Sequence, residues 1–327
     1  MYFMFPICDR LYLDIHKNEE ETLKIIKNSK DYITSTEFHE LYMPLKNDYG
    51  PINIGCIINF CDFIHEKMQS PQLTHRNIVY YIYLLNDRNN AYLLNAVFMM
   101  GCYLIIKKNI CVDKVIFDIL HIFNDHSCYF IDCVSEWGGY YSSIIDCLRA
   151  ISFIYKNEIE DLNNFDIEDY EYLTDYSHRD MNIIANKFIA MICPSKKNIG
   201  SVCEELKKRN VKLVIRLNED NNYDSKMFEN QNIDVLDLYF DDYSVPSIKI
   251  IKKFMNAVNN IEYSDKVAIH CRAGLGRTGI LICIWLIIKL NFKPAEAIAY
   301  IRIMRPGSIM GNQGFFLESI EYFKRFI

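Results

Sequence analysis

One run of ten residues near the C-terminal end of the chain combines a nucleophilic side chain with two arginines and three glycines. The run is His270-Cys-Arg-Ala-Gly-Leu-Gly-Arg-Thr-Gly279, which we call the cradle loop. A strand is predicted from Val267 to Ile269 and a helix from Ile280 to Ile288, because both runs are apolar and the glycines indicate a turn between them. Such a turn directs backbone N–H groups and the positive end of the helix dipole toward one point. The cradle loop is therefore predicted to bind an oxyanion.

Two side chains of the cradle loop indicate what would happen to that oxyanion. Cys271 stands at the lip of the loop, where the helix start and neighbouring cations favour the thiolate form of a cysteine. Arg277, six positions after Cys271, can fold back and bind two phosphate oxygens with its planar guanidinium. The sequence thus predicts a nucleophile facing a phosphate. The residues expected to surround that phosphate are Arg272, Ala273, Gly274, Leu275, Gly276 and Arg277.

A second interpretation of the same glycines is a dinucleotide-binding fingerprint. Gly274-Leu-Gly-Arg-Thr-Gly279 matches its spacing and lies between a predicted strand and a predicted helix. A dinucleotide fold also needs a second strand and a ribose-binding acid about twenty residues further on. Here that region, Lys293-Pro-Ala-Glu296, begins another predicted helix. A cysteine nucleophile facing a phosphate, as in a phosphatase, also explains Cys271 and Arg277, so we prefer this interpretation to dinucleotide binding.

Two further motifs accompany the cradle loop. Downstream lies Arg305-Pro-Gly-Ser-Ile-Met-Gly-Asn-Gln313, and upstream lies Leu238-Tyr-Phe-Asp-Asp-Tyr-Ser-Val-Pro246. These three motifs resemble the cell-division-cycle-fourteen family of mitotic-exit dual-specificity protein phosphatases, whose counterparts read Arg-Pro-Gly-Ser-Val/Ile-Ile-Gly-Pro-Gln and Leu-Phe-Phe-x-Asp-Gly-Ser-Thr-Pro. The Ala-Gly-Leu-Gly core of the cradle loop is similar to this family in particular. Weaker matches extend through the first half, so the resemblance covers most of the chain.

The reaction implied by this resemblance needs an acid as well as a nucleophile. Attack of the Cys271 sulfur on phosphorus expels a poor leaving group, which must receive a proton. The upstream motif aligns Asp242 with the acid of the family, and the adjacent Asp241 is its competitor. The same aspartate, once ionised, would take a proton from the water that hydrolyses the cysteinyl-phosphate.

Three other residues are expected to support the reaction. Thr278 would hydrogen-bond the thiolate as it leaves phosphorus, and His270 would buttress the loop backbone and tune the cysteine. Gln313 would position the attacking water, although Gly314 replaces the second glutamine of the family's pair. Because the loop and Arg277 supply the positive charge, no metal and no cofactor are expected.

Composition argues against several other classes of protein. The chain has 327 residues, 50% of them hydrophobic, which allows a large core and two domains. Its net charge of −6 argues against a general nucleic-acid binder. Its twelve cysteines show no paired or zinc-type spacing, which is typical of reduced intracellular proteins. No signal peptide or membrane-spanning run is recognised, so we expect a protein of the cytoplasm or nucleus.

The expected fold class is α/β, with two tandem dual-specificity-phosphatase-like domains joined by an acidic linker helix. Strand 78–85, turn 86–90 and the apolar helix to Ile106 repeat the layout around the cradle loop, but that turn has no cysteine and no glycine. Residues 1–155 are therefore predicted to form a catalytically inactive copy, with an unrelated α/β domain as the alternative. Residues 181–327 are the predicted catalytic domain, with a mostly parallel sheet and its active groups at the carboxyl ends of the strands. Other predicted elements are strands at 9–15, 188–192, 211–218 and 235–240, and helices at 54–67, 114–123, 142–155 and 202–209.

Residues 156–180 form the predicted acidic interdomain linker, with nine acids against Lys156 and Arg179. Within it, Phe165-Asp-Ile-Glu-Asp-Tyr-Glu171 resembles the family's Phe-Asp-Val-Asp-Glu-Tyr-Glu, whose acids help line the substrate groove. The resemblance implies phosphorylated protein partners with proline after the phosphoserine and a basic residue downstream. Thr174 replaces a further acid of the family, and a merely solvated acidic face is the alternative. The residues expected to line the groove are Glu168, Asp169 and Glu171.

The motifs together predict a metal-independent, cysteine-dependent phosphatase. The resemblance implies that it hydrolyses phosphoserine, phosphothreonine and phosphotyrosine in proteins and reverses proline-directed cyclin-dependent kinase sites in cell-cycle control. An inositol-lipid phosphatase is one alternative, although it typically has a second basic residue in mid-loop, where this chain has Leu275. A messenger-cap triphosphatase is disfavoured by Asp242. A phosphopeptide-binding scaffold would not need Cys271, Arg277 and Asp242 together.

Overall fold

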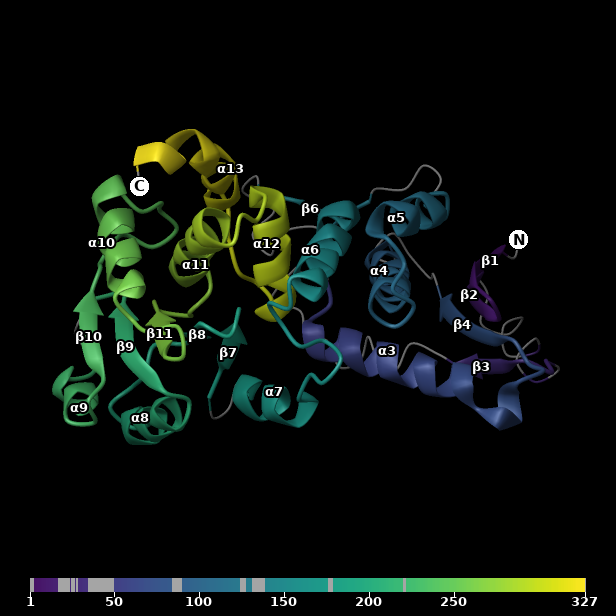
Figure 1. Ribbon diagram of the computed structural model, residues 1–327, viewed down its shortest axis with the longest axis horizontal. Helices are drawn as coiled ribbons and strands as arrows, with labels where there is room; N and C mark the ends of the chain where they lie inside the picture. The colour runs from purple at the N-terminus through teal and green to yellow at the C-terminus, as the bar shows by residue number, and fades with distance from the viewer. Residues whose placement is uncertain are drawn as a thin grey trace. The chain divides into compact units, whose positions relative to one another are not determined.

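A computed structural model of the protein describes residues 3–16, 24, 27, 29–34, 50–83, 90–123, 128–130, 139–175, 179–219 and 222–326. The chain divides into two compact units, each built around its own main sheet (Figure 1). Unit 1 comprises Met1–Leu45, Tyr49–Phe130 and Tyr141–Phe165, and unit 2 comprises Lys46–Asp48, Ile131–Tyr140 and Asp166–Ile327. The change from unit 1 to unit 2 at Phe165 and Asp166 falls inside the segment predicted as a linker.

Unit 1 contains a four-stranded sheet with the order β1-β2-β4-β3. Strand β1 pairs antiparallel with β2, and β2, β4 and β3 are parallel. Strand β2 corresponds to the strand predicted at 9–15, and β4 to the strand predicted at 78–85. The strands are β1 (Phe3–Cys8), β2 (Leu11–His16), β3 (Tyr32–Thr34) and β4 (Ile78–Tyr83), and a small second sheet pairs β5 (Tyr129–Phe130) with β6 (Ser142–Ser143).

Side-chain caps fix where two helices of unit 1 begin. The Asn53 carboxamide oxygen accepts a hydrogen bond from Cys56 N at 2.9 Å, and the Ser143 hydroxyl accepts one from Asp146 N at 3.0 Å. The predicted turn at 86–90 lies outside the described residues, apart from Asn90, which begins the apolar helix α4. The helices are α3 (Ile54–Gln69), α4 (Asn90–Ile106), α5 (Val112–Leu120), α6 (Ile144–Lys156) and the short 3-10 helix η1 (Pro71–Leu73).

Unit 2 contains a five-stranded sheet with the order β10-β9-β11-β8-β7. The first four strands are parallel, as predicted, and β7 is an antiparallel edge strand that the sequence analysis did not anticipate. The central strand β11 is buried and ends at His270, so the cradle loop begins at the middle of the sheet. The strands are β7 (Met181–Ile184), β8 (Phe188–Met191), β9 (Val211–Arg216), β10 (Asp234–Asp237) and β11 (Lys266–His270).

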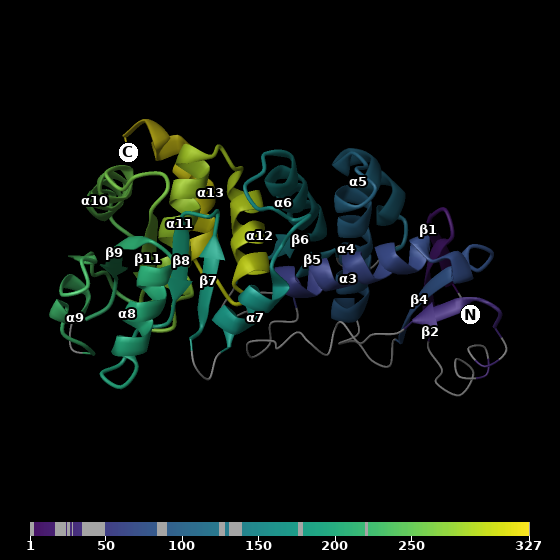
Figure 2. The same cartoon turned by 60° about the horizontal axis from the view of Figure 1, so that its bottom comes forward.

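Helices cover both faces of this sheet (Figure 2). On one face, Ile189, Val214 and Ala268 pack in a core cluster with residues of α7, α8 and α9. On the other face, Phe188 stacks on Phe254 of α10 and meets the edge of Trp285 of α11. The helices are α7 (Ile167–Thr174), α8 (Ile199–Lys208), α9 (Lys226–Glu229), α10 (Ile248–Asn259), α11 (Gly276–Lys289), α12 (Pro294–Met304), α13 (Gln313–Phe323) and the 3-10 helix η4 (Lys324–Phe326).

Two predicted boundaries next to the cradle loop differ from the structure. The helix predicted from Ile280 begins at Gly276, so Arg277 belongs to its first turn. The strand predicted over 235–240 ends at Asp237, and an irregular segment carries the chain on to Asp242. Among the described helices, none is both long and apolar enough to cross a membrane.

Candidate active site

A hollow of about 400 Å³ lies at the carboxyl ends of the parallel strands of unit 2, and we call it the cradle hollow. It brings together Cys271, Asp242 and Gln313, which come from three separate loops of the sequence. Cys271 is buried, with 3% of its surface exposed. The residues that line the hollow are Ile192, Asp242, Tyr243, Cys271, Arg272, Ala273, Gly276, Met310 and Gln313.

The turn of the cradle loop depends on glycine at position 274. Gly274 has a φ of +69°, in the left-handed region that favours glycine. A Cβ atom there would lie 2.0 Å from the backbone oxygen of Met191, at the end of the neighbouring strand β8. Any side chain at this position would displace the loop from the sheet.

A buried arginine holds the cradle loop from behind. The Arg305 guanidinium donates to the carbonyl oxygens of Gly274 at 2.8 Å and Ala273 at 3.0 Å. It is held in turn by the Asn182 side-chain oxygen at 2.6 Å and the Asp180 carboxylate at 2.8 Å. In a trans peptide the C=O and N–H groups point in opposite directions. With these carbonyls turned toward Arg305, the following amide N–H groups point away from it, as an anion cradle requires.

Arg277, in the first turn of α11, is fixed at the edge of the site. Its Nη1 donates to the backbone oxygens of Phe240 at 3.0 Å and Leu217 at 3.2 Å. Its Nε lies 3.3 Å from an Asp242 oxygen, which is an ion pair that lacks hydrogen-bond geometry. The guanidinium is thus 3% exposed and ion-paired to the carboxylate predicted as the acid.

Two buried polar atoms of this first turn have no hydrogen-bond acceptor or donor among the described residues. They are the Nε of Arg277 and the hydroxyl oxygen of Thr278. Buried polar groups are rarely left unsatisfied, and exceptions point to strain, to a functional role or to a missing partner. Both atoms belong to the helix start that forms the cradle, so a bound anion and the Cys271 sulfur are the chemically suitable partners.

The two candidate acids have different surroundings. Asp241 accepts a hydrogen bond from the Tyr239 hydroxyl at 2.9 Å, and this bond raises the pKa of Tyr239. Asp242 lines the cradle hollow, accepts from the N–H of Tyr243 at 3.1 Å and leaves half of its side chain exposed. The surroundings therefore favour Asp242 over Asp241 as a proton donor to a group bound at Cys271.

His270 is connected to a tyrosine that the sequence analysis did not consider. Burial lowers the pKa of His270 to about 4, so its ring is neutral at physiological pH. Burial also raises the pKa of the Tyr223 hydroxyl, which donates to Nε2 of His270 over 2.6 Å. The remaining ring nitrogen, Nδ1, lies 3.2 Å from the Cys271 carbonyl oxygen and donates to it in this tautomer. His270 thus fixes the backbone of Cys271.

Another buried arginine, Arg216, lies beside this tyrosine. The guanidinium of Arg216 lies 5.1 Å from the centre of the Tyr223 ring and donates to both oxygens of Asp237, at 2.6 and 2.9 Å. Since the carboxylate pairs with the guanidinium, the buried charge is compensated.

Gln313 is fully buried, and its amide accepts from Met310 N at 3.1 Å and donates to the Ser244 carbonyl at 3.1 Å.

The acids predicted for a specificity groove lie on α7 of unit 2. Asp169 receives two hydrogen bonds from Arg209, at 2.6 and 2.9 Å, so its charge is already paired. Glu168 and Glu171 are exposed. Within the described chain, none of these three acids belongs to the lining of the cradle hollow.

Sequence reasoning missed two residues that hydrogen-bond the cradle loop but lie far from it in the sequence, Arg305 and Tyr223. Arg305 opens the downstream motif, so an arginine directly before Pro-Gly was the available signal in the sequence. Tyr223 lies in a polar stretch with no periodic pattern, so nothing in the sequence indicated its contact with His270.

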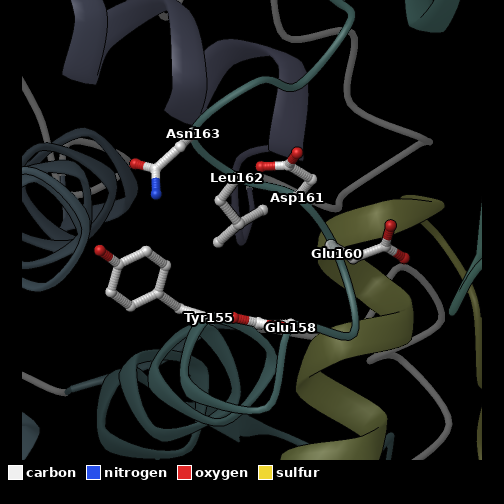
Figure 3. A pocket seen from close by; sticks show the side chains of 6 residues that line it. All are labelled: Tyr155, Glu158, Glu160, Asp161, Leu162 and Asn163. Atoms are coloured by element: carbon white, nitrogen blue, oxygen red, sulfur yellow. The ribbon is translucent and has the colours of Figure 1, made fainter.

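Unit 1 contains a hollow of about 420 Å³, which we call the acidic hollow. Figure 3 shows the Tyr155 ring and the Leu162 side chain turned toward each other, whereas the Glu160 carboxylate points away. The acidic hollow is lined by Tyr155, Glu158, Glu160, Asp161, Leu162 and Asn163.

Both halves of the chain match known protein families. Residues 6–153 match the family described as dual specificity protein phosphatase, N-terminal half, and residues 192–325 match the dual specificity phosphatase catalytic domain. Together with the α/β fold, these matches confirm the prediction of two tandem dual-specificity-phosphatase-like domains.

The resemblance to the CDC14 phosphatases, predicted from three motifs, is also confirmed over most of the chain. Dual specificity protein phosphatase CDC14A of Homo sapiens is 32% identical over 321 residues, which cover 95% of this chain and 52% of that protein. Tyrosine-protein phosphatase CDC14 homolog of Schizosaccharomyces pombe is 31% identical, over 85% of this chain and 54% of that protein. Tyrosine-protein phosphatase CDC14 of Candida albicans is 32% identical, over 93% of this chain and 56% of that protein. The chain thus spans about half the length of these relatives.

Proposed function

We propose that this protein is a cysteine-dependent phosphatase that hydrolyses phosphoserine, phosphothreonine and phosphotyrosine in proteins through a cysteinyl-phosphate. The observation that carries the proposal is the meeting of Cys271 and Asp242 in the lining of one hollow, with Arg277 ion-paired to Asp242 and the carbonyls of the cradle loop held by Arg305. The match of residues 192–325 to a dual specificity phosphatase catalytic domain supports the same chemistry.

In the proposed first step, the Cys271 thiolate attacks phosphorus while the bond to the ester oxygen breaks. Asp242 gives its proton to that oxygen, which leaves as an alcohol or phenol. The loop N–H groups and Arg277 stabilise the charge on the other phosphate oxygens.

In the second step, water attacks the cysteinyl-phosphate and Asp242 takes its proton. The sulfur then leaves as a thiolate, and Thr278 donates a hydrogen bond to it. Gln313 helps to hold the water, and His270 holds the backbone of the nucleophile throughout.

For the substrate, we propose phosphoserine followed by proline, with a basic residue downstream, in proteins of cell-cycle control. Support comes from the resemblance to the CDC14 phosphatases and from the exposed carboxylates Glu168 and Glu171 on α7. We further propose that the N-terminal domain, residues 1–155, is catalytically inactive, because the turn at 86–90 has no cysteine.

Phosphate release from a chromogenic aryl phosphate and from a phosphoserine-proline peptide, measured in EDTA, tests the function. We expect turnover of both substrates, and undiminished turnover in the chelator, because the loop and Arg277 supply the positive charge. No turnover would refute the proposal, and turnover that needs a divalent ion would refute its metal-independent chemistry.

A further inference from the structure

Tyr243, the residue after the proposed acid, has a backbone conformation that tyrosine rarely adopts. Its φ is +57°, in the left-handed region that favours glycine. The upstream motif of the CDC14 family, as quoted above, has glycine at this position. Strained backbone positions cluster at functional sites, so the contacts of the Tyr243 side chain are relevant to the site.

The Tyr243 side chain is 60% exposed and forms part of the lining of the cradle hollow. Tyr243 follows Asp242 directly in the sequence, and its backbone N–H donates a hydrogen bond to the Asp242 carboxylate at 3.1 Å. Half-buried Ile192 and Met310 complete the apolar part of the lining. The hollow that contains Cys271 therefore has an aromatic wall beside the proposed proton donor.

The position next to the acid determines which part of a substrate this wall can contact. The acid must reach the ester oxygen, so a neighbouring side chain meets the carbon atoms bonded to that oxygen. In phosphotyrosine these atoms belong to an aromatic ring, whereas in phosphoserine they are a single methylene. Aromatic pairs gain free energy beyond the burial of their area, by about 0.5–1.5 kcal/mol, whereas a methylene offers little to a ring.

We propose that Tyr243 is a specificity-determining residue that raises the activity of this chain toward aryl phosphate esters such as phosphotyrosine, in addition to the phosphoserine substrate proposed above. The inference rests on the proposed phosphatase function and refines its substrate range. The ring contacts the bound substrate in the ground state and in the transition state alike, so its contribution falls mainly on KM.

The test compares two peptides of one sequence that differ only in carrying phosphotyrosine or phosphoserine before proline. Tyr243→Gly removes the ring and suits the observed φ, so the variant is expected to fold. It should lower kcat/KM for the phosphotyrosine peptide by about 3- to 10-fold, mainly through KM, in line with one aromatic pair. The phosphoserine peptide should change by less than about twofold, since its methylene makes little contact with a ring. Tyr243→Phe should behave like the wild type with both peptides.

Tyr239→Ala serves as the matched control, because Tyr239 is a half-exposed ring of the same segment that is not part of the described lining of the hollow. We expect it to leave the ratio between the two peptides unchanged. The specificity role is refuted if Tyr243→Gly lowers kcat/KM equally for both peptides, or if Tyr243→Phe lowers kcat/KM for the phosphotyrosine peptide as much as Tyr243→Gly does. In either case the phosphatase function stands. A wild-type protein that hydrolyses neither peptide would refute the proposed function, and this inference with it.

Discussion

The acidic hollow and the cradle hollow have nearly the same volume, about 420 Å³ and about 400 Å³. The acidic hollow follows the end of α6 and has three carboxylates but no cationic side chain in its lining. The cradle hollow lies where parallel strands end, and its lining includes a cysteine and an arginine. Similar volumes therefore accompany different linings, since the acidic hollow has carboxylates without a cation, whereas the cradle hollow combines Cys271, Arg272 and Asp242.

The difference shows that the backbone around a hollow matters more than its size. Around the cradle hollow, Arg305 turns carbonyls outward and a helix begins at Gly276. Two buried polar atoms there, the Arg277 Nε and the Thr278 hydroxyl oxygen, have no hydrogen-bond partner among the described residues. These are features of a preorganised anion site. The lining of the acidic hollow comes from one continuous stretch of chain, from Tyr155 to Asn163.

Removing the proposed nucleophile, Cys271, should have the largest effect on turnover, because the cradle hollow would still bind a phosphopeptide but could not react with it. We expect Cys271→Ser to lower turnover of any phosphopeptide by about 10⁴-fold or more, as for other nucleophile deletions. Binding of the phosphopeptide, measured by calorimetry, should persist because the loop N–H groups and Arg277 remain. A variant with even a tenth of the wild-type rate would show that Cys271 is not the nucleophile.

Removing the acid should separate substrates by their leaving groups. We expect Asp242→Asn to slow phosphoserine hydrolysis by about 10²- to 10⁴-fold, the usual contribution of general acid catalysis. Aryl phosphates with good leaving groups should slow far less, because their oxygen needs little protonation. Asp241→Asn is the matched control, and a larger effect from it, or equal slowing of both substrate types by Asp242→Asn, would overturn the assignment.

A substitution of Arg305 tests whether its hydrogen bonds to the Gly274 and Ala273 carbonyls hold the cradle loop in the conformation needed for turnover. A lysine at position 305 cannot make all the hydrogen bonds that Arg305 makes to Gly274, Ala273, Asn182 and Asp180. We therefore expect Arg305→Lys to lose about 3 kcal/mol of stability and to lower kcat. Arg302→Lys is a matched control, because Arg302 is also buried on α12 but donates to Ser308 and Ile309 carbonyls, outside the loop. Arg302→Lys should lose stability while the folded protein keeps its kcat. Equal kcat for the two variants would contradict the role of Arg305.

Buried His270 predicts a stability that depends on pH. Its pKa is about 4 in the folded protein and about 6.5 when unfolded, so the unfolded chain binds more protons between these values. Stability is therefore fully present above pH 6.5 and falls as the pH is lowered toward 4, by about 2 kcal/mol at pH 5. Urea unfolding at pH 7.5 and pH 5 measures it. In His270→Gln, the difference in unfolding free energy between pH 7.5 and pH 5 should shrink by about 2 kcal/mol. In the control His75→Gln, which changes an exposed histidine, the difference should stay as in the wild type. An unchanged difference in His270→Gln would show that His270 is not its cause.

The local parts of the site were predictable, because each lies within a short stretch of sequence. The strand–glycine turn–helix pattern indicated the cradle loop, and the resemblance of the segment after β10 to the family's motif indicated Asp242 rather than Asp241. Helix α10 was not predicted, although its apolar residues Ile251, Phe254 and Val258 have helical spacing.

The contacts that hold the site together were not predictable, because they join distant residues of ordinary type. Arg305 reaches Gly274 across 31 positions, and Tyr223 reaches His270 across 47 positions. The edge strand β7 is only four residues long, too short for a clear alternation. Its Asn182 matters through a side chain that binds Arg305, which no hydrophobic pattern records.

The smallest expected effect concerns the α7 acids, whose role as a substrate groove stays a prediction. Asp169 is already paired with Arg209, so the exposed Glu171 is the better candidate to meet a basic residue of the substrate. One such exposed pair is worth about 0.2–1 kcal/mol, and salt screens it over about 10 Å at 0.1 M ionic strength. A phosphoserine-proline peptide with a downstream lysine should therefore exceed its alanine analogue in kcat/KM by less than about fivefold, and less so at high salt. Glu171→Gln should remove that advantage, whereas Asp169→Asn should affect stability more than specificity, because it breaks the pair with Arg209. If the lysine gives no advantage, or if Glu171→Gln leaves it intact, α7 presents only a solvated acidic face, and Thr174 marks where this chain departs from the family's groove.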